Sequence, residues 1–268
     1  MMSVVPQSHR ARKRFGQHFL HDGRVVQRMV AAIAPQVGQH LLEIGPGLGA
    51  LTVPLLERCH SLDVVELDRD VIPLLQEHCR GLGELRVHAM DALKLDLHSL
   101  ATSHRRLRIV GNLPYNISTP LMFHLLDAIE WVEDMHFMVQ KEVAERICAA
   151  PGSSDYGRLS VMMQYRCVTE KLFHVGPGAF SPPPRVDSAV IRLRPLRPSP
   201  WPSHDAALLS RIVAAAFSQR RKTLRNALKK VLTAEHIQAA GIDPGVRAEE
   251  LGVADYVALS SLTPETMA

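Results

Sequence analysis

Between residues 43 and 49 the chain reads Glu43-Ile44-Gly45-Pro46-Gly47-Leu48-Gly49. An apolar run at 40–44 leads into these glycines and a helical pattern at 51–58 follows them, which predicts a strand, a loop and a helix. A glycine-rich loop in this position lets a ligand approach the backbone, although its G-x-G-x-G spacing differs from the G-x-G-x-x-G of dinucleotide sites. The Glu43 carboxylate would repel a pyrophosphate but suits a ligand with a positive amino or sulfonium group. A glycine-rich turn without a ligand is the alternative.

The alternation of short apolar runs and helical patterns continues on both sides of this loop. Predicted strands cover residues 40–44, 61–66, 85–90, 107–110 and 135–139, and predicted helices cover 25–33, 51–58, 70–79, 119–128 and 141–150. Asp22 precedes the first of these helices as its N-cap. Strands interleaved with helices indicate a parallel sheet covered on both faces, with its site at the carboxyl ends of the strands.

The pattern changes after residue 150. Two β-rich runs at 167–175 and 186–193 follow a helix at 159–166, and because no crossover helix joins them they predict an antiparallel hairpin at one edge of the sheet. A proline-rich linker at 194–203 leads to helical patterns at 206–219, 223–232, 234–240 and 254–259. We therefore expect a basic disordered segment at 1–14, an α/β domain at 15–198 and a small helical domain at 199–268.

Charge is concentrated near the two ends of the chain, although the net charge is only +4. Residues 1–28 hold six Lys or Arg and one acid, and residues 206–234 hold seven Lys or Arg and no acid. Basic ends on a near-neutral body predict a polyanion-binding surface. The 4 cysteines and 14 histidines lack metal-site spacing, so we expect no metal and a reduced, cytoplasmic setting. No apolar run reaches the roughly 18 residues of a membrane span.

Two further acids follow the second and third predicted strands. Glu66 ends the second strand, where a carboxylate can accept both hydroxyls of a ribose. Asp91 ends the third and can accept a hydrogen bond from an adenine amino group. Either acid by itself is more typical of a helix cap or a solvated charge. Together with Glu43 they outline a nucleoside site, and adenosine joined to a sulfonium and an amino acid is S-adenosyl-L-methionine.

The stretch Asn112-Leu113-Pro114-Tyr115 follows the fourth predicted strand, after Gly111. The Asn112 oxygen and the carbonyl of Leu113 or Pro114 can each accept one N–H of an exocyclic amino group. The Tyr115 ring can stack on the base that carries it. The motif predicts a pocket for a planar amine, and an ordinary strand-to-loop turn is the alternative.

These features resemble the Rossmann-like methyltransferases, and the Asn112 motif resembles that of the amino-methyltransferases that act on adenine N6. More narrowly, the chain resembles the small-subunit (16S-type) ribosomal RNA adenine N6,N6-dimethyltransferases. The matching stretches are residues 15–20, 42–52, 109–120, 180–192 and 217–228. The resemblance implies a Rossmann-like sheet with a hairpin at one edge, a small all-helical C-terminal domain, and S-adenosyl-L-methionine as cofactor.

The implied reaction transfers two methyls to N6 of each of two adjacent adenosines near the 3′ end of 16S rRNA, in the small ribosomal subunit or its precursor. The resemblance also implies a role in small-subunit maturation, and we expect a monomer. Because a duplex hides N6, the target adenosine must leave its stack or come from a loop.

The resemblance assigns roles to particular residues. Cofactor contacts are expected from Gln17, His18, Leu20, Glu43, Gly45, Gly47, Gly49, Glu66, Leu67, Asp91, Ala92 and Asn112. Catalytic contacts are expected from Asn112, Leu113, Pro114, Tyr115 and Phe180, with Phe180 on the second face of the base. One departure is Gln17-His18-Phe19-Leu20, where the family usually has Gln-Asn-Phe-Leu. His18 can still hydrogen-bond the cofactor, through its side chain or its backbone.

The basic cluster of the C-terminal part is the expected RNA contact. It consists of Arg220, Arg221, Lys222, Arg225, Lys229 and Lys230, and a solvated helix face is the alternative. Rival functions are a nicotinamide dehydrogenase, a large-subunit (23S) rRNA adenine methyltransferase, a DNA adenine methyltransferase, and a non-catalytic RNA-binding assembly or transcription factor with a vestigial cofactor site. The glycine spacing argues against the first, and the run at 217–225 resembles the small-subunit type.

Overall fold

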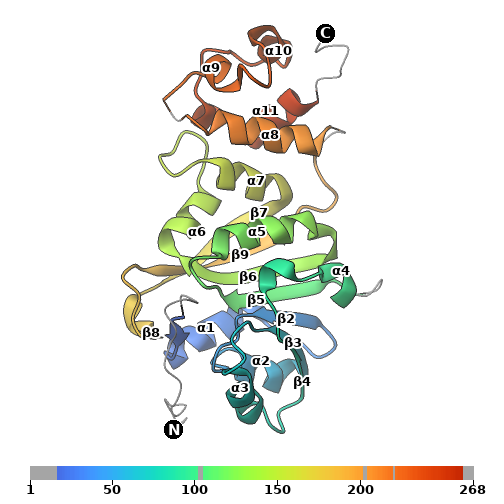
Figure 1. Ribbon diagram of the computed structural model, residues 1–268, viewed down its shortest axis with the longest axis vertical. Coiled ribbons are helices and arrows are strands. Elements are labelled where there is room, and N and C mark those ends of the chain that lie inside the picture. Colours follow the sequence, from blue (N-terminus) through green and yellow to red (C-terminus); the bar gives the residue numbers. More distant parts are fainter. Residues whose placement is uncertain (1–16, 102–104, 202–203, 220, 262–268) are drawn as a thin grey trace. The chain divides into compact units, whose positions relative to one another are not determined.

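The computed structural model describes residues 17–101, 105–201, 204–219 and 221–261 (Figure 1). The chain divides into two compact units. One comprises Met1–Ala144 and Glu170–Pro195, and the other comprises Glu145–Thr169 and Leu196–Ala268. The expected segment at 1–14 lies outside the described residues. The expected boundary at residue 198 lies three residues after the first unit ends, whereas residues 145–169 group with the C-terminal helices; the domains as such stay a prediction.

A seven-stranded sheet forms the centre of the first unit. Its strands are β2 (His40–Ile44), β3 (Ser61–Val65), β4 (Glu84–His88), β5 (Leu107–Asn112), β6 (Val132–Gln140), β7 (Cys167–Val175) and β9 (Ser188–Pro195). Their order is β4-β3-β2-β5-β6-β9-β7, and in Figure 1 the labels follow one another upward in this order. Strands β2 to β6 pair in parallel and β9 pairs antiparallel with β6. The Rossmann-like prediction is confirmed, with β9 and β7 side by side at the edge where the hairpin was expected.

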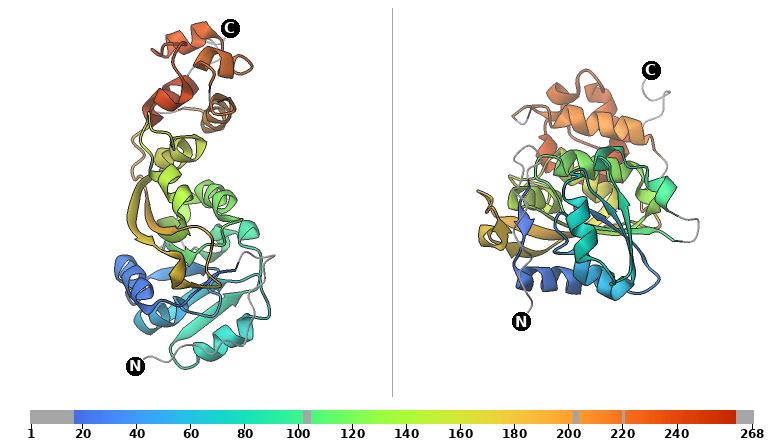
Figure 2. Two further views of the ribbon diagram at one scale, coloured as in Figure 1. Left: turned by 90° about the vertical axis from the view of Figure 1, so that its left-hand side faces the viewer. Right: turned by 60° about the horizontal axis from the view of Figure 1, so that its bottom comes forward.

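Helices α1 (Gly23–Ile33), α2 (Thr52–Cys59) and α3 (Ile72–His78) pack on one face of this sheet, where they share an apolar cluster with Leu41, Val64 and Val110. The predicted cap of α1 is confirmed, because the Asp22 carboxylate accepts from the N–H of Arg24 at 2.8 Å and of Val25 at 3.3 Å. Figure 2 gives two further views of this arrangement. Helices α4 (Leu97–Leu100) and α5 (Ser118–Asp127) also belong to the first unit, and α6 (Lys141–Cys148) begins in it and continues into the second.

Strand β5 is longer than its apolar run predicts. It continues through Gly111 to Asn112, because Gly111 permits a close approach to β2 and does not break the strand. A Cβ at Gly111 would lie 2.4 Å from the Ile44 carbonyl oxygen. The absence of a side chain at this position therefore brings the end of β5 directly beside the end of β2.

A second, two-stranded sheet was not predicted. Strand β1 (Phe19–Leu20) pairs antiparallel with β8 (Phe180–Ser181), so that Leu20 lies opposite Phe180. Two residues give too short a pattern for a strand prediction, and the pairing joins segments from opposite ends of the first unit.

The second unit contains α7 (Arg158–Arg166), α8 (Ala206–Ala216), α9 (Leu224–Leu228), α10 (Ala234–Ala239) and α11 (Val253–Ser260). All four predicted C-terminal helices are present, but α8 and α9 end earlier than their patterns suggest. After α8 the Ser218 hydroxyl donates to the Ala215 carbonyl at 2.6 Å and closes a turn. Phe217 then packs against Tyr156 and Tyr256 in the core of this unit.

Within the described residues, no helix is long and apolar enough to cross a membrane. The same residues include no group of three or more His, Cys, Asp or Glu arranged to hold a metal ion.

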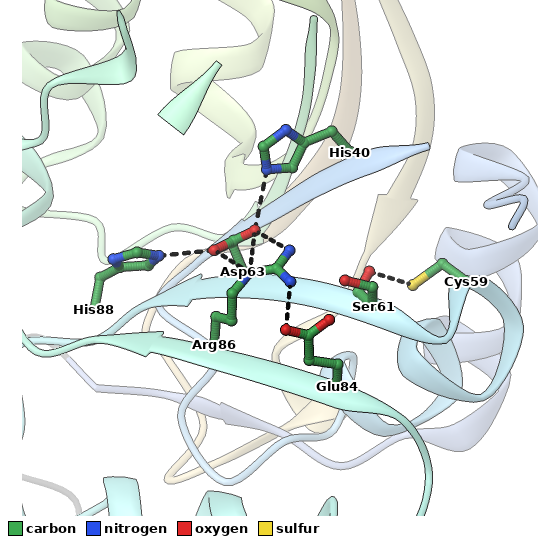
Figure 3. Close-up of polar contacts among 7 residues, drawn as sticks. All are labelled: His40, Cys59, Ser61, Asp63, Glu84, Arg86 and His88. Carbon is green, nitrogen blue, oxygen red and sulfur yellow. Dashed lines mark hydrogen bonds and ion pairs between the residues drawn. The ribbon is translucent and has the colours of Figure 1, made fainter. Parts of the chain in front are cut away.

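A buried carboxylate links β2, β3 and β4 (Figure 3). Asp63 alternates along β3 with Leu62 and Val64 and points to the opposite face, where its side chain is 3% exposed. It accepts hydrogen bonds from Arg86 at 2.8 Å, His88 at 2.8 Å and His40 at 3.0 Å. Burial by itself would raise the pKa of Asp63, but these three donors outweigh it and hold the pKa below the ordinary 3.8.

We predict that Asp63→Ala lowers the free energy of unfolding by about 2 kcal/mol at pH 7, since it leaves Arg86 and two imidazoles without their shared partner. The loss is smaller than for a fully buried pair because the Arg86 side chain is 42% exposed. The depressed pKa makes this contribution present at neutral pH and lost as the pH falls below 3.8. Urea titrations at pH 7 and pH 3 measure both effects.

Glu84→Ala is the matched control, because Glu84 pairs with the same arginine at 2.9 Å while its own side chain is 65% exposed. That pair should contribute less than about 1 kcal/mol. Equal losses in the two variants would show that burial of Asp63 adds nothing.

Candidate functional site

The carboxyl ends of β2 and β5 form the centre of the candidate site. Residues 45–49 leave β2 as a loop, and Gly45, Gly47 and Gly49 have φ angles of 69°, 55° and 91°, in the left-handed region that favours glycine. A Cβ built on Gly45 would lie 3.7 Å from both the Asn112 carbonyl oxygen and the Pro114 ring. The structure therefore brings the predicted glycine loop and the predicted amine pocket together.

Gly47 lies against the N-terminal part of the chain. A Cβ there would meet the Phe19 ring at 3.1 Å, so the N-terminal strand lies directly on the loop. The Gly47 N–H donates to Glu66 Oε2 at 3.1 Å. One residue thus contacts segments that lie before and after it in the chain.

Glu43, at the end of β2, is 1% exposed. Its Oε2 atom has no hydrogen-bond partner among the described residues. Burial raises the pKa of Glu43 to about 8; the negative charge of Glu66 adds to this effect and the Thr52 hydroxyl opposes it. A buried acid with an unpartnered oxygen beside a glycine loop is suited to receive a cationic or donor group.

Glu66 follows β3 and has both oxygens engaged. Oε2 accepts from the Gly47 N–H, and Oε1 accepts from the Asp68 N–H at 2.9 Å. Burial raises the pKa of Glu66, while these two donors oppose the shift. The next residue, Leu67, leaves 50% of its surface exposed, which is unusual for a large apolar side chain beside a buried acid.

Asp91 and Ala92 lie beyond the end of β4. The Asp91 carboxylate accepts from the Leu93 N–H at 3.0 Å and caps a short 3-10 helix, Ala92–Lys94. Ala92 is 7% exposed. Asp91 is therefore a helix cap, which was the alternative interpretation of this acid. One of its two carboxylate oxygens accepts the capping hydrogen bond.

Residues 17–20, which end in β1, contact several parts of the site. The Gln17 side-chain amide donates to Asp68 Oδ2 at 2.9 Å. The His18 carbonyl accepts from Asn112 Nδ2 at 3.1 Å, and Leu20 is 7% exposed. Sequence reasoning did not identify Asp68, although it lies two residues after Glu66 in the strand-end segment.

The predicted amine pocket has a definite arrangement of donors and acceptors. Because Asn112 Nδ2 donates to His18, its Oδ1 is the end of the amide left to accept. The Pro114 carbonyl already accepts from the Ile117 N–H at 3.2 Å, which favours Leu113 as the second acceptor. The Tyr115 hydroxyl lies 2.6 Å from Ser188 Oγ, and burial raises the pKa of Tyr115. No pattern in the sequence marks Ser188 as a partner of this tyrosine.

Phe180 lies in β8 and is 2% exposed. It belongs to the same apolar cluster as Leu20, Met29 and Val30. The structure therefore places Phe180 close to the N-terminal strand, with little of its ring accessible. Its expected role opposite Tyr115 stays a prediction.

The basic cluster belongs to the second unit. Arg221, Lys222, Arg225, Lys229 and Lys230 are exposed, and Arg220 lies outside the described residues. Helix α9 buries Leu224 and Leu228 and presents its basic residues to solvent. Backbone bonds from Leu224 to Val246 (2.8 Å) and from Arg225 to Pro244 (3.0 Å) fix this segment.

Comparison with known proteins shows the family to which the chain belongs. A family model described as ribosomal RNA adenine dimethylase matches residues 8–264. The ribosomal RNA small subunit methyltransferase A of Pseudomonas aeruginosa is 57% identical over 257 residues, covering 96% of each chain. That of Nitrosococcus oceani is 57% identical over 252 residues, covering 94% of this chain and 96% of the other.

Solved structures show the same likeness. A dimethyladenosine transferase from Plasmodium falciparum superimposes with a TM-score of 0.76 at 26% identity, covering 90% of this chain and 96% of its own. A 23S rRNA methyltransferase shares the fold, with a TM-score of 0.68 at 24% identity, covering 93% of this chain and 99% of its own.

We predict that Glu43→Gln stabilises the ligand-free protein increasingly as the pH rises from 4.5 to about 8. Because the pKa of Glu43 is raised by folding, the folded state binds more protons in this window, and the wild type loses stability across it. The relative gain of the variant should reach on the order of a few kcal/mol. Thermal unfolding at pH 5 and pH 8 measures it.

The exposed Glu57, on the neighbouring helix, supplies the control. Glu57→Gln should show no such pH-dependent gain. A constant difference between Glu43→Gln and wild type across the window would mean that Glu43 is not an acid strained by burial.

Proposed function

The chain belongs to the ribosomal RNA adenine dimethylase family, and we propose that it transfers four methyl groups from S-adenosyl-L-methionine to N6 of two adjacent adenosines near the 3′ end of 16S rRNA. We further propose that it acts as a cytoplasmic monomer on the small subunit or its precursor, with a role in subunit maturation. The observation that carries the catalytic assignment is the Asn112 amide, whose nitrogen donates to His18 and whose oxygen is thereby left to accept.

The described residues suit this cofactor on two grounds. Glu43 offers a buried carboxyl oxygen without a hydrogen-bond partner. The loop after β2 has glycine at 45, 47 and 49, each with a positive φ, so a ligand would meet main chain there and not side chains. When bound, S-adenosyl-L-methionine supplies a methyl group already activated on a sulfonium.

Cofactor-holding roles follow from these positions. Glu66 is the proposed partner of the ribose hydroxyls, exchanging its present bond from Gly47, and Leu67 offers its exposed side chain to the adenine ring. Asp91 retains one oxygen for the adenine amino group. The remaining contacts are proposed for Gln17, His18, Leu20, Glu43, Gly45, Gly49, Ala92 and Asn112.

The residues around the acceptor adenine are proposed to act by orienting its N6 amino group. The adenine N6 lone pair is delocalised into the ring and is a poor nucleophile. Asn112 Oδ1 and the Leu113 carbonyl, accepting its two N–H bonds, favour a more tetrahedral nitrogen whose lone pair points at the methyl. Positioning of this kind can contribute about 7–11 kcal/mol. No general base is required, and after one transfer the remaining N–H can still be accepted.

Two rings are proposed to hold the target base. Stacking on Tyr115 contributes about 1–3 kcal/mol. Phe180 is the proposed second ring, and Pro114 shapes the turn between them. Phe180 is 2% exposed, so its ring has to become accessible before it can contact a base.

The small-subunit assignment rests on relatives at 57% identity. The 23S methyltransferase is 24% identical, so its likeness supports the fold and gives no support to a large-subunit substrate. The alternative of a non-catalytic RNA-binding factor is disfavoured because Glu43, Glu66 and Asn112 are all present at the strand ends.

Labelled cofactor incubated with small subunits, large subunits and DNA tests this proposal. We expect label in small subunits, at two adjacent adenosines. Asn112→Ala and Tyr115→Ala should each cut the rate about 100-fold, since each removes a group that orients the acceptor, while rRNA binding stays within about twofold.

Asn116→Ala is the matched control, because Asn116 is an exposed amide in the same turn. Label in large subunits or in DNA would contradict the proposal that small-subunit rRNA is the substrate. Full activity of both Asn112→Ala and Tyr115→Ala would overturn the catalytic assignment.

The basic cluster is the proposed RNA-binding surface. We predict that reversing Arg221 and Lys222 to Glu weakens RNA binding across sequences and flattens its salt dependence by about 0.7 in log K per log salt for each phosphate that is no longer neutralised. Filter binding at several salt concentrations measures the slope. Arg58→Glu, an exposed charge on α2, should leave it unchanged. An unaltered slope in the double variant would remove these two residues from the RNA interface.

A further inference from the structure

Residues 17–19, at the start of β1 and just before it, have side chains that contact three different parts of the structure. Gln17 reaches Asp68, beyond the end of β3. Phe19 covers Gly47 in the glycine loop. His18 turns away from both, toward Tyr115 and the segment after β8. The strand therefore contacts the cofactor side through residues 17 and 19, and the acceptor side through residue 18.

The His18 imidazole makes two contacts on the acceptor side. Its ring stacks on Tyr115, with centroids 5.5 Å apart and planes inclined by 29°. Its Nδ1 lies 2.7 Å from the Pro182 carbonyl oxygen. A carbonyl oxygen accepts and cannot donate, so Nδ1 carries the hydrogen. The Nδ1 donor and one ring face of this side chain are thus both engaged on the acceptor side.

These contacts bear on the two groups that are proposed to hold the target base. Tyr115 is held at its hydroxyl by Ser188 and on one ring face by His18, which leaves the other face for a base. Asn112 is held by the His18 carbonyl, which sets which end of its amide accepts. The Pro182 contact ties the same residue to the segment that carries Phe180.

We propose that the His18 side chain is a positioning residue for the acceptor adenine and not a ligand of the cofactor. The inference rests on the proposed function and changes one of its assignments, since a cofactor contact at this position is left to the backbone. The family's usual asparagine has no ring to stack on Tyr115. The imidazole therefore gives this chain a constraint on the base pocket that the usual residue lacks.

Three substitutions separate the contributions. His18→Ala removes the ring and the donor, His18→Phe keeps a ring without the donor, and His18→Asn restores the family's usual residue. Cofactor affinity is measured by calorimetry, and turnover on small subunits is measured at saturating cofactor. Melting temperatures check folding.

We expect His18→Ala to lower turnover at saturating cofactor about 10-fold, because it removes the stacking and the hydrogen bond together. Its cofactor Kd should stay within about twofold of wild type, because the contacts of the ring are to Tyr115 and Pro182. His18→Phe should recover about threefold of the loss through stacking alone. His18→Asn should fall between wild type and His18→Ala.

His98→Ala is the matched control, because His98 makes an imidazole–aromatic contact with Trp131, at 4.8 Å between centroids, outside the candidate site. It should change neither Kd nor turnover. A His18→Ala variant whose cofactor Kd weakens about 10-fold would overturn the inference, as would one whose turnover equals that of wild type. An inactive wild type would instead overturn the proposed function, so the two failures are distinguishable.

Discussion

The close contact between β5 and β2 at Gly111 is the constraint on which the site depends. A methyl group at this position would lie 2.4 Å from the Ile44 carbonyl oxygen, so any side chain would push the two strands apart. Ile44 leads into the glycine loop and Gly111 leads into Asn112. The spacing between the glycine loop and the Asn112 motif is therefore set by main chain against main chain.

Near this contact the first unit buries carboxyl groups whose burial is not fully compensated by hydrogen bonds, which is unusual in a core that serves stability alone. Glu43 is buried with an unpartnered oxygen and a pKa raised to about 8, and the pKa of Glu66 is also raised by burial. Asp63, on the same sheet, shows the opposite solution, because three donors compensate its burial. The contrast distinguishes a carboxylate used to join strands from one kept available for a ligand.

Much of this could be predicted from the sequence, because the relevant signals are local. The alternation of apolar runs and helical patterns predicted the parallel sheet, and the glycine spacing predicted the loop that follows β2. The pairing of β1 with β8, the Tyr115–Ser188 bond and the direction of the His18 ring depend on segments more than 70 residues apart and leave no periodic signal. The burial of Phe180 could not be predicted for the same reason, because it depends on the pairing of β8 with the distant β1. The sequence allowed Asp91 to be either a ligand contact or a helix cap. The structure shows it capping the short 3-10 helix formed by the residues that follow it.

The pairing of Phe19 with Ser181 also has a consequence for biosynthesis. Loop closure over such a separation brings entropy losses before any contact compensates for them, so long-range pairings of this kind form late in folding. During translation the glycine loop and its helix can form early, but the pocket lacks Phe180 and Ser188 until those residues have emerged from the ribosome. The β1–β8 pairing and the Tyr115–Ser188 contact are thus completed only at the end of the folding of this unit.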